Sequence, residues 1–140
     1  MPDMTATRTL SPFSVLLADD DRLQLDTLQE IIEPQGFRTL LANDGEEALE
    51  IARQEIVHVA LFDVHMPKLT GLETLQLLRQ FNILLPVILI TADSSSALLH
   101  QAIQASASSV IPKPVSKNVV LYTLTRVLGR SYGHNSDRSV

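Results

Sequence analysis

The sequence of 140 residues contains no cysteine. This absence excludes a disulfide framework, a thiol nucleophile and a thiolate zinc site, and it fits a cytosolic protein. Long hydrophobic runs are also absent, because the longest, at residues 83–90, is interrupted by Pro86 and is far too short to span a bilayer. Residues 1–12 lack the basic and apolar segments of a signal peptide. We therefore expect a soluble cytoplasmic protein with no membrane contact.

Basic residues are fewer than acidic residues in this sequence. Lys and Arg total 11 against 16 Asp and Glu, which gives a formal net charge of −5. A nucleic-acid-binding module normally presents a basic face, so we expect no nucleic acid to bind this domain. The length allows one ordinary domain. We place it at residues 13–129, between an N-terminal extension (1–12) and a polar C-terminal tail (130–140) that lacks hydrophobic periodicity and is expected to fray.

Five short apolar segments have the length of β-strands, at residues 13–18, 37–42, 57–62, 86–91 and 109–111. The first, third and fourth are nearly continuous in Val, Ile, Leu and Phe, as in parallel strands that are covered on both faces. The second alternates more, as a strand near an edge does. The fifth meets Pro112 at once, and proline is tolerated in sheets mainly at edges or strand ends.

Segments with helical periodicity follow each of these strands, at residues 21–33, 44–54, 71–80, 94–105 and 116–128. Candidate caps are Asn43 or Asp44 for the second helix and Ser94 or Ser95 for the fourth. Pro34 with Gly36 should end the first helix, and Gly129 should end the last. The strict alternation predicts an α/β fold of five βα units, with a parallel, doubly wound sheet.

Ligands of open α/β sheets bind outside the carboxyl ends of the strands. The side chains expected there are Asp19, Asp20 and Asp21 after the first strand, Asp63 after the third, Thr91 at the end of the fourth and Lys113 after the fifth. Asp21 is equally a candidate helix cap.

The chemistry of this set is coherent. Clustered carboxylates repel one another unless a cation neutralises them, and Mg²⁺ suits a site of carboxylates, water and a phosphate oxygen. An aspartate carboxylate can act as a nucleophile and form an acyl phosphate. A Lys ammonium and a Thr hydroxyl can donate to the other phosphate oxygens. The pattern therefore predicts phosphorylation of Asp63, assisted by Mg²⁺.

From about residue 13 to residue 128 the sequence resembles the receiver domain of two-component response regulators, of the chemotaxis type. The motifs that carry the resemblance are Asp19-Asp20-Asp21 after Leu-Leu-Ala, Asp63 in Phe-Asp-Val-His-Met-Pro, Gly71 in Lys-Leu-Thr-Gly-Leu, Thr91 in Ile-Thr-Ala and Lys113 in Pro-Lys-Pro. The resemblance implies a flavodoxin-like sheet with strand order 2-1-3-4-5.

The resemblance also implies roles for individual residues. Asp63 would be the phosphoacceptor, Thr91 the switch hydroxyl and Lys113 the cation that pairs with the phosphate. Asp20 would bind Mg²⁺ directly and Asp19 largely through water, with Asp63 and the backbone carbonyl of His65 as further ligands. The Lys113–Pro114 peptide would be cis.

The function implied is that of a signalling domain, which catalyses only its own phosphorylation and dephosphorylation. It would take a phosphoryl group from a phosphohistidine on a sensor histidine kinase or a histidine phosphotransfer protein. It would then change its contacts with a downstream effector protein, either as a stand-alone receiver or as a domain of a larger regulator.

Two other functions stay open at this point. A haloacid-dehalogenase-type phosphatase also uses an aspartyl phosphate, but it has a second Asp two positions after the nucleophile, where this chain has His65. A phosphate-independent scaffold with the same fold would not need Asp20, Asp63, Thr91 and Lys113 together. One departure from the receiver pattern concerns the switch, since Val110 stands where the family usually has an aromatic residue. The side chains of His58, His65 and His100 are expected to be exposed.

Overall fold

The structure, a computed structural model, describes residues 13–93 and 95–133. Its elements in chain order are β1 (Ser14–Ala18), α2 (Arg22–Ile32), the 3₁₀ turn η1 (Glu33–Gln35), β2 (Arg38–Ala42), α3 (Gly45–Gln54), β3 (Val59–Asp63), α4 (Gly71–Leu78), β4 (Val87–Thr91), α5 (Ser96–Gln104), β5 (Ser109–Pro112), α6 (Lys117–Leu128) and the π-helical turn η2 (Gly129–Gly133). The predicted βα alternation is confirmed, and each strand and α-helix ends within two residues of its expected bounds. The expected extension (1–12), the tail beyond residue 133 and the cap candidate Ser94 lie outside the described residues.

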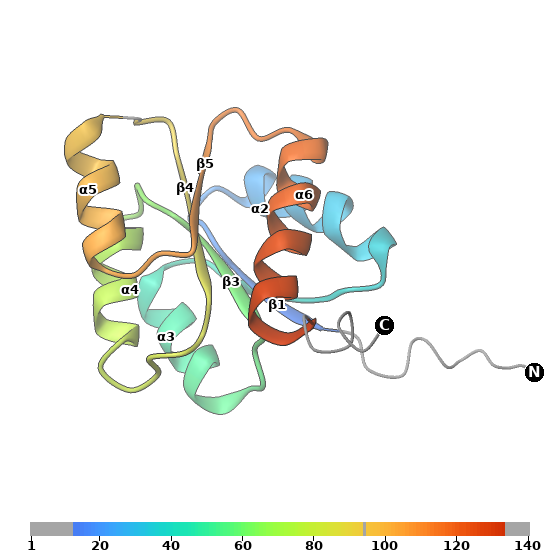
Figure 1. Ribbon diagram of the computed structural model, residues 1–140, viewed down its shortest axis with the longest axis horizontal. Helices are drawn as coiled ribbons and strands as arrows, with labels where there is room; N and C mark the ends of the chain where they lie inside the picture. The colour runs from blue at the N-terminus through green and yellow to red at the C-terminus, as the bar shows by residue number, and fades with distance from the viewer. Residues whose placement is uncertain (1–12, 94, 134–140) are drawn as a thin grey trace, which may run out of the picture.

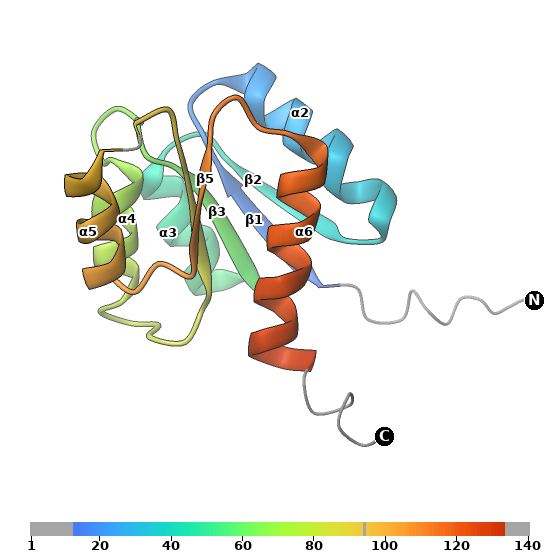
Figure 2. The same ribbon diagram turned by 45° about the horizontal axis from the view of Figure 1, so that its top comes forward.

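The five strands form one parallel sheet in the order β2-β1-β3-β4-β5. Helices α2 and α6 cover one face, and α3, α4 and α5 cover the other, as Figures 1 and 2 show. This is the flavodoxin-like arrangement that the resemblance implied. Within the described ranges, no helix combines the length and the apolar character needed to cross a membrane.

The core consists of two layers, one on each face of the sheet. Successive residues of the inner strands alternate between them: Leu16 and Phe62 belong to the layer under α3, α4 and α5, whereas Leu17 and Leu61 belong to the layer under α2 and α6. All five residues of β1, β3 and β4 are buried. The edge strands β2 and β5 are more exposed, as expected from their sequences, because only the inner strands are covered on both faces.

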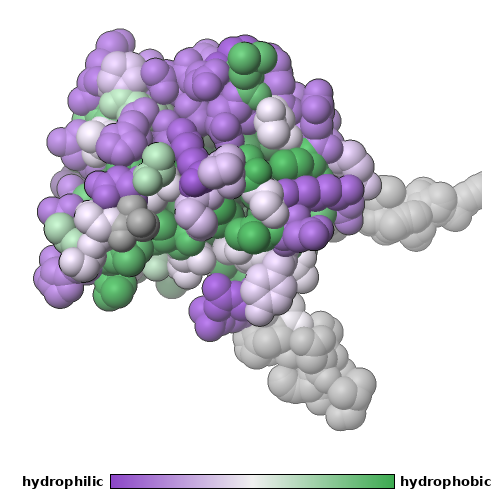
Figure 3. Space-filling view, turned by 90° about the horizontal axis from the view of Figure 1, so that it is seen from above, coloured by the Kyte–Doolittle hydropathy of each residue, from purple (hydrophilic) through white to green (hydrophobic). Residues whose placement is uncertain are grey.

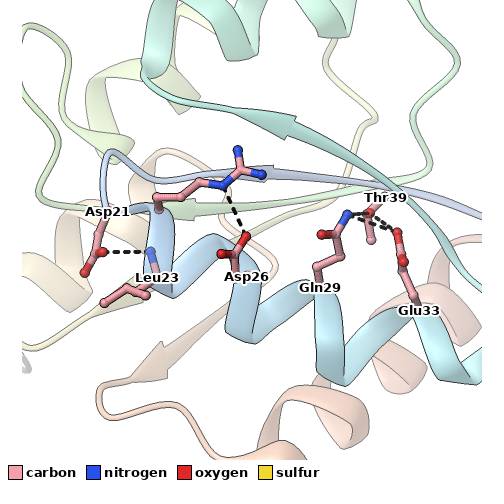
Figure 4. A network of polar contacts seen from close by, with 7 residues as sticks. Asp21, Leu23, Asp26, Gln29, Glu33 and Thr39 are labelled. Atoms are coloured by element: carbon pink, nitrogen blue, oxygen red, sulfur yellow. Dashed lines mark hydrogen bonds and ion pairs between the residues drawn. The ribbon is translucent and has the colours of Figure 1, made fainter.

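Polar contacts fix both ends of α2 (Figure 4). The Asp21 carboxylate caps the first turn by accepting the backbone N–H two residues further on, at 3.0 Å. At the other end, Glu33 accepts hydrogen bonds from the Gln29 amide at 3.1 Å and from the Thr39 hydroxyl of β2 at 2.6 Å. The predicted stop is confirmed, since Gly36 has a φ of 99° in the left-handed region that glycine tolerates.

Helix α6 ends at Leu128, as predicted, but the backbone stays helical in the turn that follows. Gly129 has a φ of −61°, so it is right-handed helical, and η2 continues the chain to Gly133. The sequence had predicted a frayed tail from residue 130 onward. Residues 130–133 instead belong to this helical turn. The ring of Tyr132 lies 5.6 Å from that of Phe13 and 5.5 Å from that of His58, and its hydroxyl donates to the His58 carbonyl at 2.7 Å. These contacts hold the turn against the amino end of the sheet.

The expectation that His58 is exposed is also wrong. The residue is half-buried just before β3, between the rings of Phe13 and Tyr132. Its Nδ1 accepts a hydrogen bond from the Ser14 backbone N–H at 2.9 Å. The imidazole is therefore a neutral acceptor at that nitrogen, and it pairs the backbone N–H of the first residue of β1.

Arg79 orders the loop between α4 and β4. Its guanidinium donates to the carbonyls of Asn82 at 3.2 Å, Leu85 at 2.7 Å and Ser106 at 3.0 Å. Three acceptors on two loops fix the planar group in one orientation. The loop is held in place although it presents the largely exposed side chain of Ile83 to solvent.

Candidate functional site

The predicted site residues lie at the carboxyl ends of four strands. Asp19 follows β1, and Lys113 follows β5, whereas Asp63 and Thr91 are the last residues of β3 and β4. In the register of the sheet, Asp63 lies opposite Ile90, the residue before Thr91. Figure 3 views this edge from above and shows mostly hydrophilic residues in its upper half. The topology brings the predicted side chains to one edge of the sheet.

Asp63 and Lys113 form an ion pair. The Asp63 side chain is 4% exposed, and its Oδ1 lies 2.9 Å from Nζ of Lys113, whose side chain is 28% exposed. Burial alone would lower the pKa of Lys113, but the hydrogen bond to Asp63 and the charge of that carboxylate outweigh it, so the pKa is raised. Lys113 is thus held as a cation beside Asp63. Its peptide bond to Pro114 is cis, as the resemblance implied.

Two further carboxylates, those of Asp19 and Asp20, lie beside this pair. Oxygens of Asp19, Asp20 and Asp63 all lie within 4.8 Å of one another. Asp20 is exposed, whereas Asp19 is 2% exposed; its Oδ1 accepts the Asp21 N–H at 2.9 Å, and its buried Oδ2 has no hydrogen-bond partner. Burial, aided by the charges of Asp63 and Asp20, raises the pKa of Asp19 to about 6, against the opposing effects of the Asp21 N–H and Lys113.

This arrangement fits a hard divalent cation. Mg²⁺ prefers oxygen ligands and usually takes only one or two carboxylates from the protein, with water at its other positions. The unpartnered Oδ2 of Asp19 is a buried acceptor that a cation or its bound water would satisfy. Asp20 supplies an exposed carboxylate at the mouth of the site. The residues present therefore fit the magnesium ion that the sequence predicted.

A chain of hydrogen bonds connects Thr91 to the start of α5. The Thr91 side chain is buried, and its hydroxyl oxygen accepts the Asp93 N–H at 2.9 Å. The Asp93 carboxylate in turn accepts the Ser95 N–H at 2.9 Å, and the Ser95 hydroxyl oxygen accepts the Leu98 N–H at 3.2 Å as the helix cap. The sequence predicted Ser95 as one of two caps but gave no sign of the link to Thr91, because the link passes through backbone groups.

The loop after Asp63 is set by close packing. A Cβ added to Gly71 would lie 2.3 Å from the Asp63 carbonyl oxygen, so only glycine allows α4 to start against the end of β3. Thr70 and Glu73 form a capping box there, with bonds of 3.0 and 2.9 Å. The box was not among the predicted caps, although a Thr followed three residues later by Glu is its signature.

His65, His100 and Val110 lie around the site or farther from it. The side chains of His65 and His100 are exposed, as predicted. That the His65 carbonyl is a metal ligand remains a prediction. Val110 is half-buried on β5, opposite Leu89, and packs against the core layer under α3, α4 and α5.

Comparisons with known sequences agree with this description. The sequence pattern of the response regulator receiver domain matches residues 15–125. The chain is 36% identical over 118 residues to the transcriptional regulatory protein CpxR of Escherichia coli (strain K12), a match that covers 84% of this chain and 50% of that protein. It is 32% identical over 126 residues to the response regulator MprA of Mycobacterium leprae, which covers 90% of this chain and 55% of that protein. The chain thus spans about half the length of these relatives.

Solved structures give the same result. A CheY-like response regulator receiver domain from Methanospirillum hungatei JF-1 superposes with a TM-score of 0.83 at 27% identity, covering 86% of this chain and 97% of that one. A chain of the CheX–CheY–BeF₃–Mg²⁺ complex from Borrelia burgdorferi superposes with a TM-score of 0.82 at 29% identity, covering 86% and 92%.

Proposed function

Because the chain belongs to the response regulator receiver domain family, we propose that Asp63 is the residue that accepts its phosphoryl group. A receiver domain is a signalling domain rather than an enzyme that turns over a separate substrate. The observation that carries the proposal is the environment of Asp63. Its carboxylate is buried, lies 2.9 Å from Nζ of Lys113, and shares a 4.8 Å cluster with Asp19 and Asp20.

In the proposed transfer, an oxygen of the Asp63 carboxylate forms a bond to phosphorus. The bond between phosphorus and the imidazole nitrogen of the donor phosphohistidine breaks, and its electron pair returns to the ring. The product is an acyl phosphate. The signal ends by hydrolysis: water attacks the phosphorus, which restores the carboxylate and releases inorganic phosphate.

The neighbouring residues have separate roles. Lys113 is placed to pair with the phosphoryl oxygens once Oδ1 of Asp63 is committed to the new bond. The Thr91 hydroxyl is placed to donate to another phosphoryl oxygen, which would end its present role as acceptor for the Asp93 N–H. Asp19, Asp20, Asp63 and the His65 carbonyl would hold Mg²⁺. When bound, the ion supplies charge neutralisation for the carboxylates and the phosphoryl oxygens.

The partners belong to the same proposal. The phosphoryl donor would be a sensor histidine kinase or a histidine phosphotransfer protein, and the output would be a contact with a downstream effector protein. We place the domain in the cytoplasm. With a formal net charge of −5, the domain lacks the basic excess that favours contacts with nucleic acid phosphates.

Neither alternative function has a supporting observation. The metal-binding carboxylates Asp19 and Asp20 precede Asp63 in the chain, which is the reverse of their order in haloacid-dehalogenase-type phosphatases. A phosphate-independent scaffold would have no use for a buried carboxylate oxygen without a partner, as at Asp19.

The test is phosphorylation with acetyl phosphate and Mg²⁺, followed by mass spectrometry. The wild-type protein should gain one labile phosphoryl group, and Asp63→Asn should gain none, because an amide is a poor nucleophile. Asp26→Asn makes the same chemical change at an accessible aspartate of α2 and should be phosphorylated like the wild type. A labile phosphate that persists on another residue of Asp63→Asn would contradict the assignment.

A further inference from the structure

Helices α3 and α4 lie side by side (Figures 1 and 2), and a glycine lies at their contact. Gly45 is the first residue of α3 and is buried. A Cβ built on it would lie 2.2 Å from Oγ1 of Thr74 and 2.9 Å from Cβ of Leu69. Carbon atoms of real side chains do not approach so closely, so any larger residue at position 45 must displace α4 or the loop before it.

Glycine is not required at position 45 for the conformation of its own backbone. Among the described residues, Gly36 is the glycine with a positive φ. The start of α3 is already capped, since Asp44 accepts the Glu47 N–H at 2.8 Å and Glu47 accepts the Asn43 N–H at 2.6 Å. The close approach of α4 is therefore the physical reason for the missing side chain.

The atoms that Gly45 contacts cannot move aside easily. The Thr74 side chain is fully buried, and its hydroxyl donates to the Thr70 carbonyl at 2.8 Å. Thr74 is β-branched, which restricts its χ1 rotation. Leu69 lies next to the helix cap Thr70, and its N–H donates to the Pro67 carbonyl at 2.7 Å.

The displaced segment leads directly to Asp63. The Gly71 N–H at the start of α4 donates to the Val64 carbonyl at 2.9 Å, and Gly71 has no room for a Cβ against the Asp63 carbonyl. The first turn of α4 is therefore in contact with α3 on one side and with the end of β3 on the other. Movement away from α3 would reach Asp63 and the loop that carries His65.

We propose that Gly45 is a positioning residue for phosphorylation, because it sets the place of the α4 first turn and of the loop that follows Asp63. The inference rests on the proposed function of Asp63. It concerns a residue that has no contact with the phosphoryl group and acts through Leu69 and Thr74.

Three variants test the proposal: Gly45→Ala, Thr74→Ala, and the double variant. Gly129→Ala is the matched control, because a Cβ at this helical glycine meets nothing within 4 Å. Thr74→Ala removes the nearest atom without leaving the Thr70 carbonyl unpaired, since the Thr74 N–H also donates to it at 2.9 Å. The measurements are the Mg²⁺ dissociation constant by NMR titration, the initial rate with acetyl phosphate, the amide shifts of residues 64–70 without metal, and thermal unfolding.

Gly45→Ala should weaken Mg²⁺ binding and slow phosphorylation by roughly tenfold, as the loss of a supporting contact does at other metal sites. These effects should be present far below the unfolding temperature and should accompany amide shifts in residues 64–70. The added Thr74→Ala should restore part of the loss, because only the contact with Leu69 then remains. Gly129→Ala should match the wild type in all four measurements.

Wild-type Mg²⁺ affinity and phosphorylation rate in folded Gly45→Ala would overturn the inference about Gly45 but leave the proposed function intact. The same holds if the added Thr74→Ala restores none of the loss. If Gly45→Ala does not fold, the double variant is compared with Thr74→Ala, and equal Mg²⁺ affinities would overturn the inference. A wild-type protein that neither binds Mg²⁺ nor becomes phosphorylated would instead overturn the proposed function, so the two failures are distinguishable.

Discussion

The two ends of the parallel sheet are built from opposite kinds of contact. At the carboxyl end, carboxylates of Asp19, Asp20 and Asp63 lie within 4.8 Å of one another, and one buried oxygen lacks a partner. At the amino end, the rings of Phe13, His58 and Tyr132 pack together, and hydrogen bonds of 2.7 and 2.9 Å connect them to the backbone. The repelling carboxylates at the carboxyl end cost stability, whereas the packed rings at the amino end contribute stability.

Asp20→Ala should show the largest effect at the carboxyl end. Loss of this proposed metal ligand should lower the phosphorylation rate with acetyl phosphate at fixed Mg²⁺ by roughly a hundredfold or more. Unfolding in urea without Mg²⁺ should show equal or greater stability than the wild type, because one of several repelling carboxylates has gone. Asp26→Asn again serves as the control. A wild-type rate in Asp20→Ala would contradict its metal role, and the carboxyl end of the sheet could then not be described as a metal site.

Tyr132→Ala should act in the opposite sense at the amino end. Loss of two ring contacts and one hydrogen bond should lower the free energy of unfolding by about 2 kcal/mol, with the phosphorylation rate unchanged. Tyr122→Ala is the control, since its side chain is 68% exposed and its loss should cost less than about 1 kcal/mol. A phosphorylation defect in Tyr132→Ala would show that the two ends are coupled rather than independent.

A smaller effect is expected from pH at the amino end. Burial and the positive charge of Arg38 lower the pKa of His58 below its usual 6.5 in the folded protein. As the pH falls below about 6.5, the unfolded chain binds a proton at His58 that the folded chain does not bind. The contribution of His58 to the free energy of unfolding is therefore fully present above this pH and decreases below it. Once the pH is below the pKa of His58 in the folded protein, titration of His58 causes no further decrease.

Urea unfolding between pH 8 and pH 5 measures this contribution. His58→Gln should lose less stability than the wild type over that interval, and His100→Gln, which alters an exposed histidine, should behave like the wild type. Equal losses in wild type and His58→Gln would mean that the imidazole is not the acceptor for the Ser14 N–H.

The smallest expected effect is a set of amide shifts on addition of beryllofluoride and Mg²⁺. If the Thr91 hydroxyl turns toward the phosphoryl mimic, its bond to the Asp93 N–H is lost and the turn that caps α5 through Ser95 should respond. Val110 is short and stiff at χ1, so strand β5 should respond little. Shifts centred on residues 109–111, with a quiet Asp93 and Ser95, would contradict this expectation.

The sequence was sufficient for the fold and for the polar set of the site. Continuous apolar runs such as that ending at Phe62 report burial on both faces, and the topology then placed Asp63, Thr91 and Lys113 at one edge without any need for their contacts. What the sequence did not reveal depends on distant pairs. Tyr132 lies 74 residues from His58, and no local pattern indicates that the two meet.

The errors have the same origin. Residues from 130 onward were expected to fray, but Tyr132 packs against the amino end of the sheet and the chain forms a π-helical turn as far as Gly133. The close contact at Gly45 was not predictable for a similar reason, because its lack of a side chain matters only once α4 packs against it.

The Arg79 guanidinium has a consequence for proteases. Trypsin cleaves after arginine only when it can draw the extended side chain into its own pocket, and the peptide must leave its helix or loop to fit the cleft. Arg79 is held by three carbonyls from two loops, so exposing the bond to Gln80 requires local unfolding of the whole region. Arg22, on the exposed first turn of α2, is held instead by a single ion pair with Asp26. Brief digestion of the folded protein should therefore spare the bond after Arg79 even though the neighbouring loop lies at the surface.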